Sequence, residues 1–253
     1  PHAEAMALAQ AGDAAKGATA YITLEPCAHQ SPRGPSCADS LIASGIARVV
    51  VALIDPDVRT HGAGIALLQA AGVSVEIGLG ADAAQRAMAG WLMQQQAGRP
   101  LVTLKLATSL DGCIALDAGE SHWITGAASR AHSHLERARN HMILVGRGTY
   151  DSDAPQLTVR LAGLTAQSPA RALLTHGDAR KGWLALNAPE KIQDLADVQY
   201  LMVEGGAETA AAFLKAGLVD RLMLYRAPIL IGRGKACLGD IGLHHLADAH
   251  GQW

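Results

Sequence analysis

Two short segments near the start of the sequence carry side chains that could bind a metal ion and move protons. His2 lies just before Glu4, and Cys27, which follows Pro26, is followed by Cys37. A histidine and two cysteines supply three ligands that zinc prefers, and zinc with three protein ligands keeps a fourth position for water. A carboxylate near the metal but not bound to it can carry a proton from that water to a leaving amine. We therefore predict a hydrolytic zinc site with His2, Cys27 and Cys37 as ligands and Glu4 as the catalytic acid–base group, which is deaminase chemistry.

The same cysteines have two simpler interpretations. They could be buried thiols, or they could belong to a closed structural zinc site in a non-catalytic scaffold. A closed site needs a fourth protein ligand, for which His29 is the candidate. The order of His-x-Glu, then Pro-Cys, then a further cysteine is the signature of zinc deaminases and favours the catalytic site.

The length and composition indicate two globular domains that bind neither nucleic acid nor membranes. With 253 residues, 49% of them hydrophobic and 17% charged, the chain can bury two cores. Its formal net charge of −2 creates no field that would attract a polyanion, so a phosphorylated small substrate must be held by local groups. The longest apolar run, residues 49–54, is far shorter than a membrane span, and no signal peptide is visible. We expect a cytoplasmic protein whose four cysteines are metal ligands or free thiols.

The elements expected in the first part of the chain position these residues. A helix that begins at the first residues and ends at Gly12 places His2 and Glu4 at its start. A strand over 20–24 delivers Cys27 at the carboxyl end of a strand, where open α/β sheets place their sites. Alternating strands and helices predict a parallel, three-layer unit. The further elements are helices over 38–44, 65–71 and 85–96 and strands over 47–54 and 73–77.

A second domain is expected after a Gly-Arg-Pro segment at 98–100. We therefore divide the chain into domains of residues 1–98 and 99–253. A strand over 198–203, then Gly205 and Gly206, then a helix over 207–215 could hold a phosphate on backbone amides, although paired glycines often serve only as turns. The other expected elements are strands over 101–107, 142–146 and 220–225, a turn over 109–112, a helix over 129–140 and a polar loop over 151–156.

Several segments, in the same order along the chain, resemble the bifunctional riboflavin-biosynthesis deaminase/reductase family over nearly the whole length. The segments 2–4, 23–37 and 48–52 resemble its deaminase domain, and the segments 105–112, 119–125, 157–160 and 203–206 resemble its reductase domain. The resemblance implies a three-layer, cytidine-deaminase-like zinc domain, N-terminally incomplete here, followed by an α/β domain like dihydrofolate reductase. The chain departs from the family at 153–155, where Asp-Ala-Pro stands in place of the usual Asp-Asp-Pro.

The resemblance implies two consecutive reactions on one phosphorylated pyrimidine. The zinc domain would deaminate 2,5-diamino-6-ribosylamino-4(3H)-pyrimidinone 5′-phosphate, and the second domain would reduce the ribosyl to the ribityl side chain with NADPH. We expect this small molecule, and neither nucleic acid nor a membrane, as the partner, and we expect a homo-oligomer. The alternative enzyme is a monofunctional zinc nucleotide or nucleoside deaminase whose second domain is not catalytic.

Two catalytic residues of the second domain follow from the order of elements. Because the ends of parallel strands meet at one edge of the sheet, we expect Lys105 to polarise the sugar carbonyl as hydride arrives and Asp153 to face the cofactor; the alternative for Lys105 is a surface cation at a strand end. The resemblance assigns further residues. Arg137 and Arg160 would be phosphate partners because guanidinium groups match phosphate geometry, although Arg137 could also be a solvated helix residue. The substrate would be held by Ser121, Arg137, Leu157, Arg160 and Glu204. The cofactor site would comprise Ala107, Trp123, Thr149, Asp153, Gly205, Gly206, Ala207, Glu208, Thr209, Ala210, Ala211 and Ala212.

Overall fold

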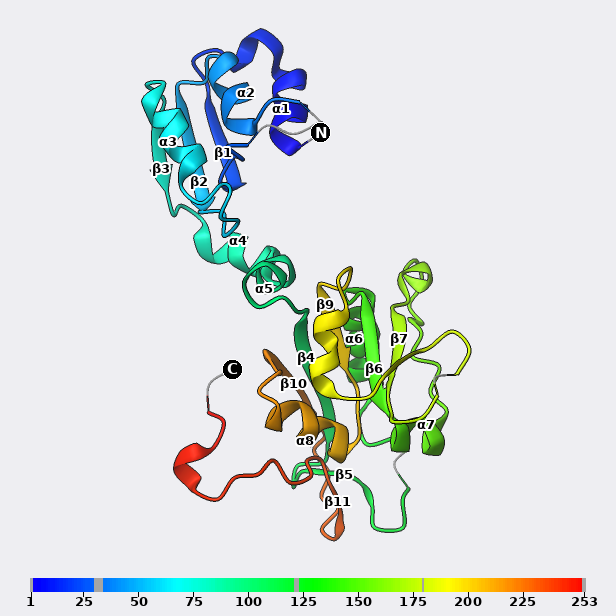
Figure 1. The fold of residues 1–253 in the computed structure, drawn as a ribbon. Helices are drawn as coiled ribbons and strands as arrows, with labels where there is room; N and C mark the ends of the chain where they lie inside the picture. Colours follow the sequence, from blue (N-terminus) through cyan, green and yellow to red (C-terminus); the bar gives the residue numbers. More distant parts are fainter. Residues whose placement is uncertain (1, 30–33, 121–122, 179, 252–253) are drawn as a thin grey trace. The chain divides into compact units, whose positions relative to one another are not determined.

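The computed structural model describes residues 2–29, 34–120, 123–178 and 180–251, and the chain divides into two compact units (Figure 1). The first unit comprises Pro1–Gln96 and the second Ala97–Trp253, and each is described by itself. None of the helices in the described part of the chain is long and apolar enough to cross a membrane.

The first unit is built on a parallel sheet with the strand order β1-β2-β3. Its register pairs Ala20 with Val49, and alternate residues of neighbouring strands therefore share one face. Leu8, Leu41 and Leu68, one from each of the first three helices, pack into one core with Val49. The elements are α1 (Ala3–Ala11), β1 (Thr19–Leu24), α2 (Cys37–Ala43), β2 (Arg48–Leu53), α3 (Ala63–Ala70), β3 (Ser74–Ile77), α4 (Ala81–Ala87) and α5 (Ala89–Ala97).

Local sequence signals fix the ends of the two helices that carry the candidate ligands. The chain leaves α1 at Gly12, whose positive φ of 52° favours glycine. Helix α2 begins after Ser36, whose hydroxyl accepts a hydrogen bond from the Asp39 amide at 3.0 Å. The cap places Cys37 at the first position of α2, and His2 directly precedes α1.

One helix expected in this unit is wrong. The segment 85–96 was expected as a single helix, but α4 ends at Ala87 and α5 begins at Ala89. Between them Met88 has φ −106° and ψ 12°, which lies outside the α-helical range and separates the two helices.

The second unit contains a six-stranded sheet in the order β10-β4-β9-β6-β7-β8, in which every neighbouring pair is parallel. Strands β5 and β11 form a separate, two-stranded antiparallel sheet. The elements are β4 (Leu101–Thr108), β5 (Cys113–Leu116), α6 (Ala127–Ala138), β6 (Met142–Gly146), α7 (Arg147–Asp153), β7 (Ala170–Leu174), β8 (Leu184–Leu186), β9 (Tyr200–Val203), α8 (Ala207–Lys215), β10 (Arg221–Arg226) and β11 (Gly234–Ala236).

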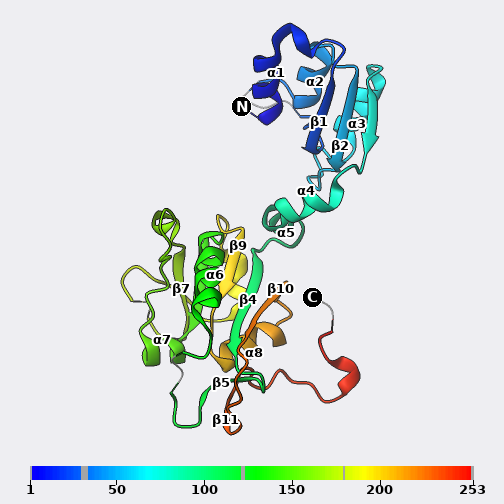
Figure 2. The same ribbon diagram turned by 180° about the vertical axis from the view of Figure 1, so that it is seen from behind.

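Helices α6 and α8 cover opposite faces of this sheet (Figures 1 and 2). On the α8 face, Phe213 and Leu214 pack with Leu104 and Leu144 in the larger core cluster. On the other face, Ile143, Val145 and Met202 form a second cluster with the loop residue Leu157. The second unit is therefore a three-layer α/β structure, in agreement with the α/β domain that the family resemblance implies.

The strand β6 and the helix α8 have the bounds that the sequence predicts, whereas two other expectations for this unit need correction. The segment 151–156 is not wholly a loop, because α7 continues to Asp153. Lys105 does not end its strand, because β4 continues to Thr108. The segment 168–197, for which no element is expected above, contains β7 and β8.

Candidate functional site

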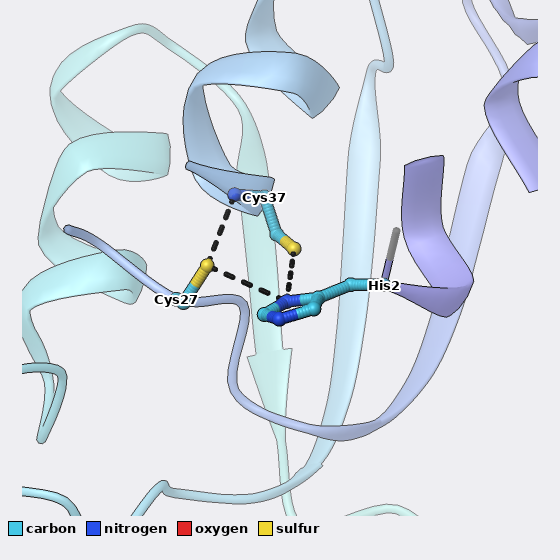
Figure 3. Close-up of side chains that lie close together, drawn as sticks. All are labelled: His2, Cys27 and Cys37. Carbon is cyan, nitrogen blue, oxygen red and sulfur yellow. Dashed lines mark hydrogen bonds between the residues drawn. The ribbon is translucent and has the colours of Figure 1, made fainter. Parts of the chain in front are cut away.

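Three side chains with metal-binding atoms meet in the first unit. His2 comes from the start of α1, Cys27 from the loop after β1, and Cys37 from the start of α2. Figure 3 shows these side chains pointing toward one another. The Nδ1 atom of His2 lies 3.1 Å from Cys37 Sγ and 3.7 Å from Cys27 Sγ, and all three ligand atoms lie within 4.8 Å of one another. The fold thus unites the three ligands predicted from the sequence.

The donor set and its spacing fit zinc. A tetrahedral ion with ordinary Zn–N and Zn–S bonds separates a nitrogen and a sulfur ligand by about 3.6 Å, close to the distances observed. His29, the candidate fourth ligand, does not belong to the cluster; its Nδ1 lies 3.5 Å from Thr60 Oγ1. Within the described residues the cluster therefore has three protein ligands, which leaves a position for water.

Backbone amides at the start of α2 hold Cys27 next to Cys37. The Cys37 amide donates to Cys27 Sγ at 3.3 Å, and the Ala38 amide donates to the Cys27 carbonyl at 3.2 Å. Burial raises the pKa of the Cys37 thiol, and the hydrogen bond with Cys27 and the charge of Glu4 raise it further. A metal cation would oppose these effects, because a coordinating thiol loses its proton.

Glu4 occupies the place of an unligated carboxylate beside this cluster. It lies in the first turn of α1, and its Oε2 accepts a hydrogen bond from Cys37 Sγ at 3.5 Å. Glu4 is half-buried and is not one of the clustered ligands. A carboxylate so placed can receive and deliver protons next to a metal-bound water.

The second unit contains a cavity of about 1080 Å³ between α6, α7, the start of α8 and the exposed ends of the strands. Most of the residues predicted for the reductase site line it. These are Lys105, Ala107, Trp123, Arg137, Thr149, Asp153, Leu157, Arg160, Glu204, Gly205, Gly206, Ala207, Glu208 and Thr209.

Four predicted residues are not placed at this cavity. Ala210 and Ala211 are buried on the side of α8 that packs into the core, and Ala212 is also absent from the cavity wall. A helix turns most of its residues away from a ligand at its N-terminus, so a continuous segment from Gly206 to Ala212 could not all face the cavity. Ser121 lies outside the described residues.

A buried group of three charges stands at the centre of the cavity wall. Glu204 accepts two hydrogen bonds from Arg137, at 2.7 Å from Nε and 2.8 Å from Nη2, and lies 3.7 Å from Lys105 Nζ. The sheet register explains the contact, because Leu104 pairs with Val203 and so places Lys105 level with Glu204. Lys105 is thus not a freely solvated surface cation.

The electrostatics of this group keep Glu204 ionised. Burial would raise the pKa of Glu204, but the hydrogen bonds from Arg137 and the charge of Lys105 outweigh burial, so the pKa is lowered. Arg137 also donates to the Thr158 carbonyl at 3.2 Å, and its side chain is only 13% exposed. Protein groups therefore engage three of its five N–H donors, and the guanidinium still lines the cavity, where the other donors could meet a phosphate.

The start of α8 could receive the phosphates of a dinucleotide. Gly205 approaches Thr209 so closely that a Cβ at this position would overlap the threonine side chain. The Gly206 amide donates to Thr149 Oγ1 at 2.9 Å, and no side chain from the described residues caps the following amides of α8. Uncapped amides at a helix N-terminus that lines a cavity are a fit for an anionic cofactor group.

Tyr225 and His134 are among the cavity residues that sequence reasoning missed. The Tyr225 hydroxyl lies 2.7 Å from Nδ1 of His132, and its ring lies 5.8 Å from Lys105 Nζ. Burial raises the pKa of Tyr225, while burial and the neighbouring arginines lower that of His134. The available signal was alternation along β10, which puts Tyr225 on the same face as Met223.

Comparisons with known proteins agree with this pair of sites. Residues 1–53 match the model of the cytidine and deoxycytidylate deaminase zinc-binding region, and residues 100–252 match the RibD C-terminal domain. The riboflavin biosynthesis protein RibD of Escherichia coli is 39% identical over 98% of this chain and 81% of its own length. That of Aquifex aeolicus is 36% identical over 98% of this chain and 80% of its own length.

Two solved structures extend the likeness to the fold. Acinetobacter baumannii RibD has a TM-score of 0.83 at 35% identity, covering 98% of this chain and 80% of that one. A deaminase/reductase from Thermotoga maritima has a TM-score of 0.84 at 28% identity, covering 99% of this chain and 79% of that one. The chain belongs to the RibD family of riboflavin biosynthesis, bifunctional enzymes that join a zinc deaminase to an NADPH-dependent reductase.

Proposed function

We propose that residues 1–98 remove the 2-amino group of 2,5-diamino-6-ribosylamino-4(3H)-pyrimidinone 5′-phosphate and that residues 99–253 then reduce its ribosyl side chain with NADPH. The observation that carries the first step is the open three-ligand cluster with Glu4 beside it. The second step rests on the cavity that joins Lys105, Glu204 and the uncapped start of α8.

In the deaminase step, His2, Cys27 and Cys37 would hold the zinc ion, which supplies a bound water of lowered pKa as nucleophile. Glu4 would take a proton from the attacking water and deliver one to the amine nitrogen, so that a C2–O bond replaces the C2–N bond and the nitrogen leaves as ammonia. Because Glu4 does not bind the metal, one carboxylate can serve both proton transfers. His29 has no part in this site.

In the reductase step, NADPH would supply a hydride to C1′, and Lys105 would place positive charge at the sugar ring oxygen, whose bond to C1′ breaks and which is protonated to a hydroxyl. Glu204, held by Arg137, fixes the lysine Nζ atom and presents its remaining acceptor capacity to the substrate. Asp153, the last residue of α7, lies on the cavity wall where it can contact the nicotinamide end of the cofactor.

The substrate phosphate would be bound by Arg160 and Arg137. Both line the cavity; Arg160 is exposed there, and Arg137 keeps two N–H donors beyond those given to Glu204 and Thr158. Leu157, which has a positive φ of 54°, and Ser121 would complete the substrate side. The cofactor side would comprise Ala107, Trp123, Thr149, Asp153 and the segment 205–209.

The reaction needs no macromolecular partner. We expect the enzyme to act in the cytoplasm as a homo-oligomer on this small phosphorylated substrate, without nucleic acid or a membrane. Size-exclusion chromatography with light scattering would measure the oligomeric state, and a monomer at working concentration would contradict the expectation.

One experiment tests both steps. The protein is incubated with the diaminopyrimidinone phosphate, with and without NADPH, while ammonia and the cofactor absorbance are followed together. Ammonia release without NADPH and cofactor oxidation only after deamination are expected. Glu4→Gln should keep zinc and lose deamination by about two to four orders of magnitude, the usual span for a general acid–base group.

The outcomes separate the alternatives. Ammonia release without any binding or oxidation of NADPH would favour a monofunctional deaminase. Undiminished zinc content in Cys27→Ser or Cys37→Ser would refute the ligand set. Ammonia release by Glu4→Gln at the parental rate would refute the proton-transfer role.

A further inference from the structure

A buried carboxylate next to the metal cluster has no part in the chemistry described so far. Glu25 follows β1, two positions before Cys27, and is only 3% exposed. Three backbone amides donate to it: Asp55 at 3.2 Å and Gly62 at 2.9 Å to Oε2, and Ile65 at 3.1 Å to Oε1. Both carboxylate oxygens are thus used to bind main chain, which a solvated or catalytic acid would not do.

These hydrogen bonds join the Cys27 turn to two other parts of the first unit. Asp55 follows β2, whereas Gly62 and Ile65 belong to the start of α3. The Glu25 amide itself donates to the Leu53 carbonyl at 2.8 Å. Glu25 therefore ties the turn to the end of β2 and the start of α3 through hydrogen bonds to main-chain groups of those elements.

Close packing holds the same turn from the other side. A Cβ at Gly64 would overlap the carbonyl oxygen of Pro26, so α3 can approach the turn only with glycine at this position. Beyond Pro26, the amides of Cys37 and Ala38 bind Cys27. The turn that carries Cys27 is clamped between α3 and α2.

We infer that Glu25 is a positioning residue for the metal site: it sets the Cys27 thiol at its binding position before zinc arrives. The reason is that His2 and Cys37 each lie at a helix start, whereas Cys27 lies in a loop whose path Glu25 determines. Groups that orient a metal ligand without touching the metal typically change metal affinity by about 10- to 100-fold when removed. The inference rests on the proposed ligand set.

The test is the zinc affinity of the full chain carrying Glu25→Gln, measured by competition with a chromophoric chelator. The glutamine keeps one acceptor oxygen but turns an amide donor toward a backbone amide, so at least one of the three hydrogen bonds is lost. Zinc binding about 10- to 100-fold weaker is expected, together with an altered visible spectrum of the Co²⁺-substituted protein. Glu76→Gln, an exposed carboxylate on β3, is the matched control and should bind zinc normally.

A role in folding alone predicts a different result. Hydrogen exchange of the zinc-free chain gives the stability of the first unit, and a purely structural Glu25 would lower that stability while the folded fraction keeps the parental zinc affinity. That outcome overturns the inference. If the first unit does not fold with Glu25→Gln, Glu25→Asp is used in the same zinc-affinity assay. Aspartate keeps the charge, but its side chain is shorter by one methylene and cannot reach all three amides.

Cys27→Ser separates this inference from the ligand assignment. If Cys27→Ser loses zinc while Glu25→Gln keeps the parental affinity and Co²⁺ spectrum, the positioning role is wrong and the ligands stand. If Cys27→Ser itself keeps zinc, the ligand set is wrong, and the positioning role fails with it.

Discussion

Replacing Arg137 by methionine should destabilise the second unit strongly. The substitution keeps an unbranched apolar stem but removes the guanidinium and with it both hydrogen bonds to Glu204. The Glu204 side chain is only 9% exposed, and within the described residues its ion-pair partner would then be Lys105, at 3.7 Å.

The expected loss is about 3 kcal/mol. Removal of one partner from a buried ion pair costs about 3 to 5 kcal/mol, because the remaining charge is left without compensation. The low end applies here because Lys105 still offsets part of the charge of Glu204. Arg139→Met on the same helix is the control: its side chain is 63% exposed, and its pair with Glu136 should contribute no more than about 0.5 kcal/mol.

The destabilisation should also depend on pH. In the parental protein Glu204 has a lowered pKa, so its ionised form stabilises the folded state when the pH is above the unfolded-state pKa of about 4.3. This stabilisation is lost as the pH falls through the folded-state pKa. Without Arg137, burial is the dominant influence and raises the pKa of Glu204, so the ionised form opposes folding. The difference in the free energy of unfolding between the parental protein and Arg137→Met should therefore grow from pH 4 to pH 7.

Hydrogen exchange in urea, read from peptides of β6 and β9 and corrected for the intrinsic rate at each pH, measures this difference within the full chain. These strands form the centre of the second sheet, so their exchange reports unfolding of that unit. A loss no larger than that of Arg139→Met, or one that is equal at both pH values, would refute the account of a buried, compensated Glu204.

Three further predictions address the cavity and its surroundings. Gly205→Ala should weaken NADPH binding at least about tenfold, because the new Cβ overlaps Thr209 and must shift the start of α8; isothermal titration giving parental affinity would contradict this. Lys105→Met should lower turnover more than cofactor affinity in steady-state kinetics, because Glu204 keeps its ion pair with Arg137 and the site stays formed. An unchanged rate of reduction of the deaminated substrate would exclude the catalytic role. The pKa of Asp111 is lowered to about 2 by a serine hydroxyl and by the amides of 231–232, so the turn that it holds should persist until pH falls from about 4 toward 2. Exchange of peptides spanning 231–232 should show this transition, and Asp111→Asn should lack it.

Continuous apolar runs made much of the fold predictable. The residues of β6 are all buried, and a parallel strand covered on both faces must be apolar along its whole length. Strands β7 and β8 lack that signal, because each has exposed residues and β8 is only three residues long. Strand β7 pairs with β6, and β8 pairs with β7; no local sequence pattern reports these pairings.

The residues of the candidate sites also differ in whether local sequence could predict them. The metal ligands follow from residue types and order, because zinc chemistry restricts which side chains can serve. The partner of Arg137 could not be predicted, since Glu204 lies 67 residues away on another element and meets it only after the sheet has formed. Glu25 was visible in its motif, but its role depends on amides of residues as far as Ile65, which the fold brings to it.

The two sheets also differ in when they can form during synthesis. Strands β1, β2 and β3 are neighbours both in sequence and in the sheet, so these three strands can pair once residue 77 has left the ribosome. Within the described residues, strand β4 pairs with β9 and β10, which begin at Tyr200 and Arg221. Until those residues are made, the apolar strand β4 has both edges open, which favours pairing with other chains. A ribosome that stalls before Tyr200 would therefore leave the paired strands of the metal-binding unit attached to an aggregation-prone strand.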